Sequence, residues 1–187
     1  MQRHTMPART RLVTAEEFAR FPDDDQHYEL VEGRVVRMSP PGIRHGALAT
    51  RIASLLHQHV DAHHLGAVLT PAGFWLARDP DTVREPDVAF ISAERVASTG
   101  IPDGFWPGPP DLAVEIRSPG DRLAEIGAKV SDYLARGVRL VWVVDPKEKT
   151  VTVHDSKSPA VVLGMGDEID AADIVPGFSC VVRRFFE

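Results

Sequence analysis

The sequence of 187 residues contains one cysteine, Cys180, and this scarcity excludes a fold held together by internal disulfide bonds. So little cysteine suits a reducing compartment, and we expect a cytoplasmic protein. The sequence also lacks any apolar run near the ~20 residues that cross a bilayer, and no signal peptide is recognisable. There is no internal repeat and no low-complexity tract. These absences leave a globular protein as the expected class.

Basic residues are too few to make the chain positive, and its formal net charge is −6. A negative balance argues weakly against nucleic-acid binding, because phosphate contacts need Lys and Arg. The acids are nevertheless concentrated in residues 78–115. That segment holds eight acids (Asp79, Asp81, Glu85, Asp87, Glu94, Asp103, Asp111, Glu115) against three bases (Arg78, Arg84, Arg95). If some of these carboxylates hold a divalent cation, the working protein is less negative than the count suggests.

Hydrophobic residues make up 43% of the chain, which is enough for one domain with a proper core. We expect a flexible N-terminal arm over residues 1–13 and a single domain over residues 14–187. The pattern predicts a capped helix opening at Thr14, hairpins at 28–39 and 150–164, helices at 43–63 and 121–136, strands at 67–70, 74–77, 83–91, 111–117 and 140–146, and a loop at 98–110. The expected fold class is α/β (α+β), with helices packed on a mixed central sheet.

The strand 111–117, DLAVEIR, carries charged residues where a buried strand should be apolar. Alternation places Leu112, Val114 and Ile116 on one face, and Glu115 and Arg117 on the other. The strand, helix, strand order that follows implies a parallel pair whose strands are well covered. A buried charge there is costly unless it is paired. The segment therefore indicates either a structural Glu115–Arg117 ion pair or a functional site.

Two further charged residues combine with Glu115. Asp87 follows Pro86 at the start of a predicted strand, and two carboxylates brought together favour a cation such as Mg²⁺. From Glu115 the strand rises about 10 Å to its end at ~3.3 Å per residue, and the helix then descends about 12 Å to Lys129 at 1.5 Å per residue. Lys129 thus returns to the height of Glu115. It lies at the flank of the apolar stripe that this helix is expected to bury, which consists of Leu123, Ile126, Val130, Tyr133 and Leu134. The alternatives are a turn role for Asp87 and a surface pair between Lys129 and Glu125.

Several segments together resemble a known family. EPDVAF, PDLAVEIRSPGDR and YLARGVRLVWVVDP, in this order, are similar to the Uma-two type restriction-endonuclease family of the PD-(D/E)XK nuclease superfamily. The resemblance covers nearly the whole chain and implies a restriction-endonuclease-like fold and a metal-dependent nuclease core. It matches Asp87 and Glu115 to the two acids of the motif. Arg117 stands where the standard motif has lysine, and the family's lysine matches Lys129.

We therefore expect a metal-dependent endonuclease that hydrolyses phosphodiester bonds in DNA with Mg²⁺ or Mn²⁺. Asp87 and Glu115 would hold the metal, Lys129 would act at the attacking water or the phosphate, and Arg117 could clamp a phosphate. Cleaving both strands of a duplex usually needs two sites, so a homodimer is expected. The alternatives are a catalytically inactive nucleic-acid-binding or protein-interaction module and a metal-free hydrolase with paired carboxylates, such as a glycosidase.

Other residues rank below these. Glu29 could add a carboxylate from the first hairpin, although an exposed strand position is equally consistent with the sequence. His45 begins the long helix and could touch phosphate or water, but exposure at the helix start is favoured. His59 and His63 have zinc-ligand spacing, yet no third ligand is evident and a solvated helix end is favoured. Cys180 is expected in the core.

Overall fold

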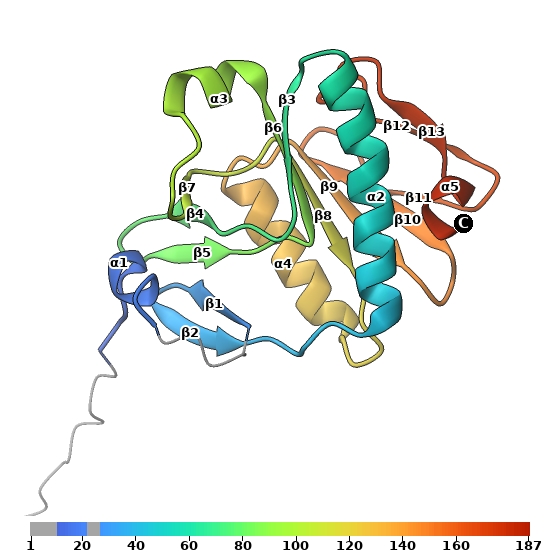
Figure 1. Cartoon of the computed structure of the whole chain (residues 1–187). Coiled ribbons are helices and arrows are strands. Elements are labelled where there is room, and N and C mark those ends of the chain that lie inside the picture. The colour runs from blue at the N-terminus through green and yellow to red at the C-terminus, as the bar shows by residue number, and fades with distance from the viewer. Residues whose placement is uncertain (1–10, 22–26) are drawn as a thin grey trace, which may run out of the picture.

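A six-stranded mixed sheet runs through the middle of the molecule in the computed structural model, which describes residues 11–21 and 27–187 (Figure 1). In spatial order its strands are β11 (Val161–Leu163), β10 (Thr150–Asp155), β9 (Leu140–Asp145), β8 (Leu112–Ile116), β6 (Val88–Ser92) and β3 (Gly66–Leu69). β8 and β9 are parallel, and α4 (Leu123–Ala135) connects them, as the sequence predicts. The other neighbouring strands are antiparallel.

A second, five-stranded sheet lies beside the first and carries the N-terminal hairpin. Its order is β2 (Arg34–Arg37), β1 (Tyr28–Val31), β5 (Thr82–Arg84), β4 (Phe74–Ala77) and β7 (Trp106–Pro107). The hairpin turns at Glu32 and Gly33, whose φ angles of 49° and 71° suit a tight turn that favours glycine. The predicted hairpin at 28–39 is therefore confirmed. The strands β12 (Glu168–Asp170) and β13 (Ser179–Val181) form a small separate sheet.

Two helices cover opposite faces of the six-stranded sheet. The long α2 (Ile43–Ala62) packs Ile52 and Leu56 into a core with Val114 and Trp142. α4 packs its own apolar stripe into a second core, together with the opposite faces of β8 and β9. Period-two alternation sends neighbouring residues of each strand to different helices. The short helices α1 (Ala15–Phe18), α3 (Ala93–Thr99) and α5 (Arg183–Phe186) complete the fold.

The structure corrects several element boundaries. The predicted strand 83–91 is two strands, β5 and β6, in different sheets, because residues 85–87 break it at Pro86, which lacks an N–H for the ladder. The expected loop 98–110 contains the end of α3, which the sequence reading missed, and the short β7. Leu123 was expected in the core but is 72% exposed, since it is the first residue of α4.

The structure also tests the expectations for the N-terminal segment, for the capping box at Thr14 and for Cys180. The predicted arm spans residues 1–13, and residues 1–10 lie outside the described part of the chain; Val13 donates its N–H to the Gly33 carbonyl at 2.9 Å. The capping box at Thr14 is present, with Glu17 as its partner. Cys180 is buried, as expected. None of the helices within residues 11–21 and 27–187 is both long and apolar enough to span a membrane.

Candidate active site

Strand register brings Asp87 and Glu115 side by side. The antiparallel strands β6 and β8 pair Val88 with Val114, so the residue before the first and the residue after the second lie opposite each other. The Asp87 carboxylate also accepts the Ile116 N–H through Oδ2 at 2.7 Å. Two carboxylates that are 28 residues apart in the sequence therefore meet at one end of the six-stranded sheet.

Lys129 reaches this pair from α4. Its ammonium lies 2.8 Å from Glu115 Oε2, and its side chain is only 11% exposed. One turn later Tyr133 donates its hydroxyl to Glu115 Oε1 at 2.6 Å. The structure thus brings Lys129 to the height of Glu115, whereas the surface pair with Glu125 is not formed, because Glu125 faces Arg122 instead. The catalytic role of Lys129 stays a prediction.

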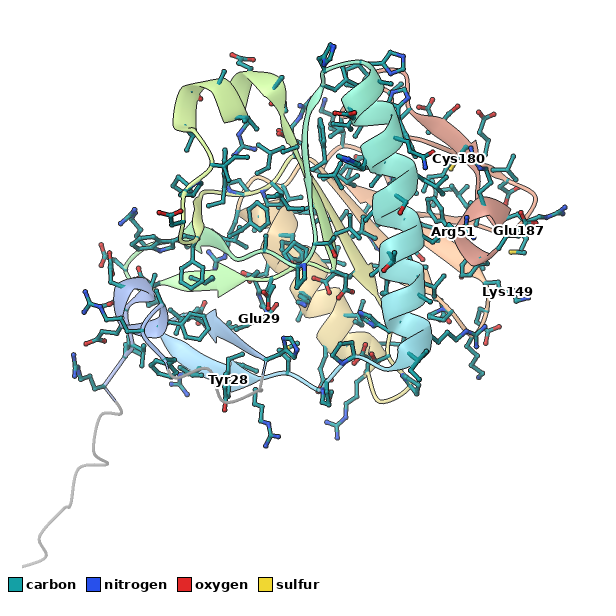
Figure 2. The ribbon with its side chains drawn as sticks, in the orientation of Figure 1. Tyr28, Glu29, Arg51, Lys149, Cys180 and Glu187 are labelled. Atoms are coloured by element: carbon teal, nitrogen blue, oxygen red, sulfur yellow. The ribbon has the colours of Figure 1, made fainter. Side chains whose placement is uncertain are left out.

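Glu29 completes the buried cluster from the N-terminal hairpin. It is 2% exposed, so the exposed strand position allowed by the sequence is wrong. Its Oε1 lies 3.1 Å from the Lys129 ammonium and accepts the Glu85 N–H, while its Oε2 accepts from Arg84 Nη1 at 2.7 Å. Figure 2 labels Glu29 where β1 faces α4. Lys129 therefore lies between two carboxylates that belong to different sheets.

Burial and charge shift the ionisation of this cluster. Burial raises the pKa of Glu115 to about 7, and the negative charges of Asp87 and Glu29 add to the effect while Lys129 opposes it. Burial also acts to raise the pKa of Glu29, but the charges of Lys129 and Arg84 outweigh it, and the net pKa is lowered. Burial tends to lower the pKa of Lys129, yet the two glutamates raise it above its ordinary value. The ammonium is thus held in its charged form.

His45 lies against Asp87, contrary to the favoured expectation of an exposed helix start. Its Nε2 is 2.8 Å from Asp87 Oδ1, and its side chain is 14% exposed. The hydrogen bond to Asp87 raises the pKa of His45 above its ordinary value, although burial opposes this. On the other ring nitrogen, Nδ1 lies 3.4 Å from Ser118 Oγ. The first turn of α2 is thereby tied to the end of β8.

Arg117 does not pair with Glu115, so the structural ion pair considered from the sequence is wrong. The guanidinium instead binds Asp145 at the end of β9 through Nη1. Its Nε is buried and has no hydrogen-bond partner among residues 11–21 and 27–187. Arg117 follows Ile116, the last residue of β8, and its side chain therefore lies past the end of this strand, next to the parallel strand β9.

A pocket of about 560 Å³ opens over these residues, within the size range of small-ligand sites. Six carboxylates and three Lys or Arg side chains line it, in addition to His27 and His45: Glu29, Glu85, Asp87, Glu115, Asp121 and Glu125, with Arg37, Arg84 and Lys129. In the described ranges, no group of three or more His, Cys, Asp or Glu side chains is arranged to hold a metal ion. A cation in this pocket would therefore rely on two carboxylates and water.

The histidine pair of α2 is separate from this pocket. His59 Nε2 bonds the Pro176 carbonyl at 2.9 Å, and His63 Nδ1 bonds the His59 carbonyl at 2.8 Å. Each ring thus has a nitrogen engaged with backbone. His63 is exposed and His59 is half-buried, so the solvated helix end expected from the sequence is found for His63.

Sequence reasoning missed two residues that shape the site. Tyr133 was predicted only as part of the apolar stripe of α4, yet its hydroxyl is the second donor to Glu115. The signal was available, since Tyr133 follows Lys129 by four residues and shares its helix face. Arg84 was counted among the bases of residues 78–115 and given no role. Its partner Glu29 is 55 residues away in the sequence, and only the five-stranded sheet brings the two strands together.

Comparison with known proteins gives a family and a fold. The family model described as "Putative restriction endonuclease", named Uma2, matches residues 15–183. A crystal structure from Anabaena variabilis, described as "a putative nuclease belonging to DUF820", superposes with a TM-score of 0.79 at 19% sequence identity. The match covers 93% of this chain and 97% of that one, and it shows a shared fold. No curated protein sequence matches the chain.

Proposed function

We propose, from the premise that this chain belongs to the Uma2 family of restriction-endonuclease-type proteins, that it is a metal-dependent endonuclease acting on the phosphodiester bonds of DNA. One observation carries the proposal: Asp87 and Glu115 meet on adjacent strands with the Lys129 ammonium 2.8 Å from Glu115, in a pocket. Opposed carboxylates with a neighbouring fixed cation can bind a metal ion and a phosphate together.

The donor set fits a hard divalent cation. Each oxygen of Asp87 and Glu115 is an acceptor in one hydrogen bond of the structure, and a carboxylate oxygen has two lone pairs, so capacity remains. Burial raises the pKa of Glu115, and the charges of Asp87 and Glu29 add to this effect; a bound cation would favour the charged form of Glu115. Asp87 and Glu115 would hold Mg²⁺ or Mn²⁺. When bound, such an ion supplies polarisation of the phosphoryl oxygen and a more acidic water.

The chain's own cations have separate tasks in this proposal. Lys129, held charged between Glu115 and Glu29, stabilises negative charge that develops on the phosphate. The planar guanidinium fork of Arg117 suits a phosphate oxygen. Its buried Nε–H is a donor that a ligand could satisfy. His45 holds the Asp87 carboxylate in place through Oδ1.

The second candidate is a catalytically inactive nucleic-acid-binding or protein-interaction module on the same fold. It is favoured by one observation: every carboxylate oxygen of Asp87 and Glu115 already has a partner within the protein. In that case the cluster is a structural ion-pair network, which also perturbs pKa values.

A plasmid-nicking assay in Mg²⁺ or Mn²⁺ separates the two candidates. We expect the wild-type protein to convert supercoiled DNA to nicked and linear forms, and Asp87→Asn and Glu115→Gln to lose that activity. Calorimetric titration with Mn²⁺ runs beside it, with Glu168→Gln, an exposed strand glutamate, as the matched control. Absence of both Mn²⁺ binding and cleavage in folded wild-type protein would leave the inactive module as the answer.

A further inference from the structure

The Lys129 ammonium is placed by a chain of contacts that starts outside the carboxylate pair. Glu29, buried at 2% exposure, is one of the two carboxylates that hold the lysine. A buried carboxylate keeps its charge and orientation only if its oxygens are satisfied. The shortest of the hydrogen bonds to Glu29 comes from Arg84 of β5, whose Nη1 lies 2.7 Å from Oε2. What fixes Arg84 therefore bears on where Lys129 lies.

Arg84 is fixed from α4. Its Nε donates to Asp132 Oδ2 at 3.0 Å, and its side chain is 12% exposed. The guanidinium is thus bound on two edges, by Glu29 from β1 and by Asp132 from α4. Because its donors form a rigid planar fork, holding it at two positions leaves little freedom to the carboxylate that it binds. Burial tends to lower the pKa of Arg84, but Glu29 and Asp132 raise it above its ordinary value.

Asp132 and Lys129 stand three residues apart on α4, so they share a helix face. The contacts therefore close on themselves: Lys129 binds Glu29, Glu29 binds Arg84, Arg84 binds Asp132, and the helix returns to Lys129. One face of α4 therefore carries both Lys129 and Asp132, and Asp132 fixes Arg84, which in turn fixes Glu29, the partner of Lys129. A closed set of this kind resists displacement of any one member, because each is held from two sides.

We propose that Arg84 and Asp132 are positioning residues that set the location of the Lys129 ammonium beside Glu115. The proposal rests on the function proposed above for the role of Lys129, but the geometric part is independent of turnover. Arg84 lines the pocket, but its guanidinium is directed to Glu29 and Asp132. Loss of Arg84 frees Glu29 to turn or to take up a proton, and Lys129 then keeps only one of its two carboxylate partners. The ammonium becomes mobile and more open to reagents.

The test compares three arginine variants. Arg84→Met removes the fork, Arg84→Lys keeps the charge but cannot bind Glu29 and Asp132 as the fork does, and Arg95→Met is the matched control. Arg95 also pairs with a buried carboxylate, Asp111 at 3.2 Å, but it is not among the described residues that line the pocket. Asp132→Asn, which is nearly isosteric, is the second route should Arg84→Met not fold. Circular dichroism establishes that each variant is folded before it is used.

Two measurements are made on each folded variant. The first is DNA cleavage in Mn²⁺, under single-turnover and steady-state conditions. Arg84→Met should lower kcat by about 10- to 100-fold with KM nearly unchanged, which is the typical effect of removing a residue that orients a catalytic group without contacting the substrate. Arg84→Lys should recover part of the loss, and Arg95→Met should stay within about twofold. The second is the rate at which Lys129 is acetylated without metal, followed by mass spectrometry. It should rise in Arg84→Met and Asp132→Asn but not in Arg95→Met.

The outcomes separate the two proposals. Wild-type kcat and wild-type Lys129 acetylation in Arg84→Met would overturn the positioning role while leaving a nuclease intact. The predicted acetylation pattern in a wild-type protein that cleaves no DNA would overturn the nuclease proposal and keep the positioning of the ammonium. A fall in kcat that is equal in Arg84→Met and Arg95→Met, with no change in acetylation, would show a general loss of structure and also overturn the inference.

Discussion

Replacing Glu115 with glutamine should change how the stability of the protein depends on pH. The pKa of Glu115 is raised from its ordinary 4.5 to about 7, mainly by burial. Between these values the folded protein holds a proton that the unfolded chain releases. The free energy of unfolding should therefore fall as pH rises from about 4.5, and level off above about 7. At about 1.4 kcal/mol for each pH unit of that gap, the total loss is about 3 kcal/mol.

The variant removes this loss because an amide does not ionise. Glutamine can still accept the Tyr133 hydroxyl, so the two proteins should have similar stabilities at pH 5. From pH 5 to pH 8 the difference in unfolding free energy should move by up to about 3 kcal/mol in favour of Glu115→Gln. Glu29 contributes in the opposite sense: its lowered pKa gives stability that is lost on acidification, and this contribution is present in both proteins.

Urea denaturation at pH 5, 6, 7 and 8 measures the difference, with tryptophan fluorescence as the signal, since Trp142 is fully buried. Glu168→Gln, on the exposed face of β12, should leave the profile of the wild-type protein unchanged. A Glu115→Gln difference that stays constant within about 0.5 kcal/mol from pH 5 to pH 8 would refute the reasoning. It would mean that Lys129 compensates the buried charge completely.

Three other predictions follow from the site. Mn²⁺ at 100 times its Kd should stabilise the folded protein by about 2.7 kcal/mol, seen as a higher melting temperature, and Asp87→Asn should abolish the response; a mutant that responds like wild type places the metal elsewhere. Lys129→Ala should lower kcat by ~10²–10⁴-fold with little change in KM, whereas Arg117→Ala should chiefly weaken substrate binding, measured in titrations of uncleaved DNA. Cleavage by Lys129→Ala at the wild-type rate would contradict these separate roles. Light scattering should give a homodimer, as expected if both strands of a duplex are cut, and a monomer at working concentration argues against paired sites.

The central part of the fold was predictable because it follows from local periodicity. The alternation around Glu115 placed that residue on the face opposite Leu112 and Val114, and the two cores have this arrangement. The rise of the strand and of the helix then placed Lys129 at the same height, where the ammonium is found. Both arguments use only distances along a single chain segment and the geometry of regular elements.

The rest depends on contacts between distant segments, which one sequence does not encode locally. Glu29 can be buried because it forms ion pairs with Arg84 and Lys129. Both partners are distant in the sequence, so the residues around Glu29 do not predict its burial. His45 was expected in solvent for the same reason: its partner Asp87 lies 42 residues away. Pro86, by contrast, was a local signal that was underused, since a proline between two apolar runs indicated that the strand was broken there.

β8 has hydrogen-bonded neighbours along both edges, with β9 on one side and β6 on the other. An interior strand of this kind gives up its amide protons to solvent only when the domain as a whole comes apart, unlike a loop that opens by itself. Glu115 therefore keeps its place in the sheet in every folded molecule. Any control over the proposed reaction must act at the rim of the pocket, where α2 and α4 begin, because the strand that carries Glu115 does not open by itself.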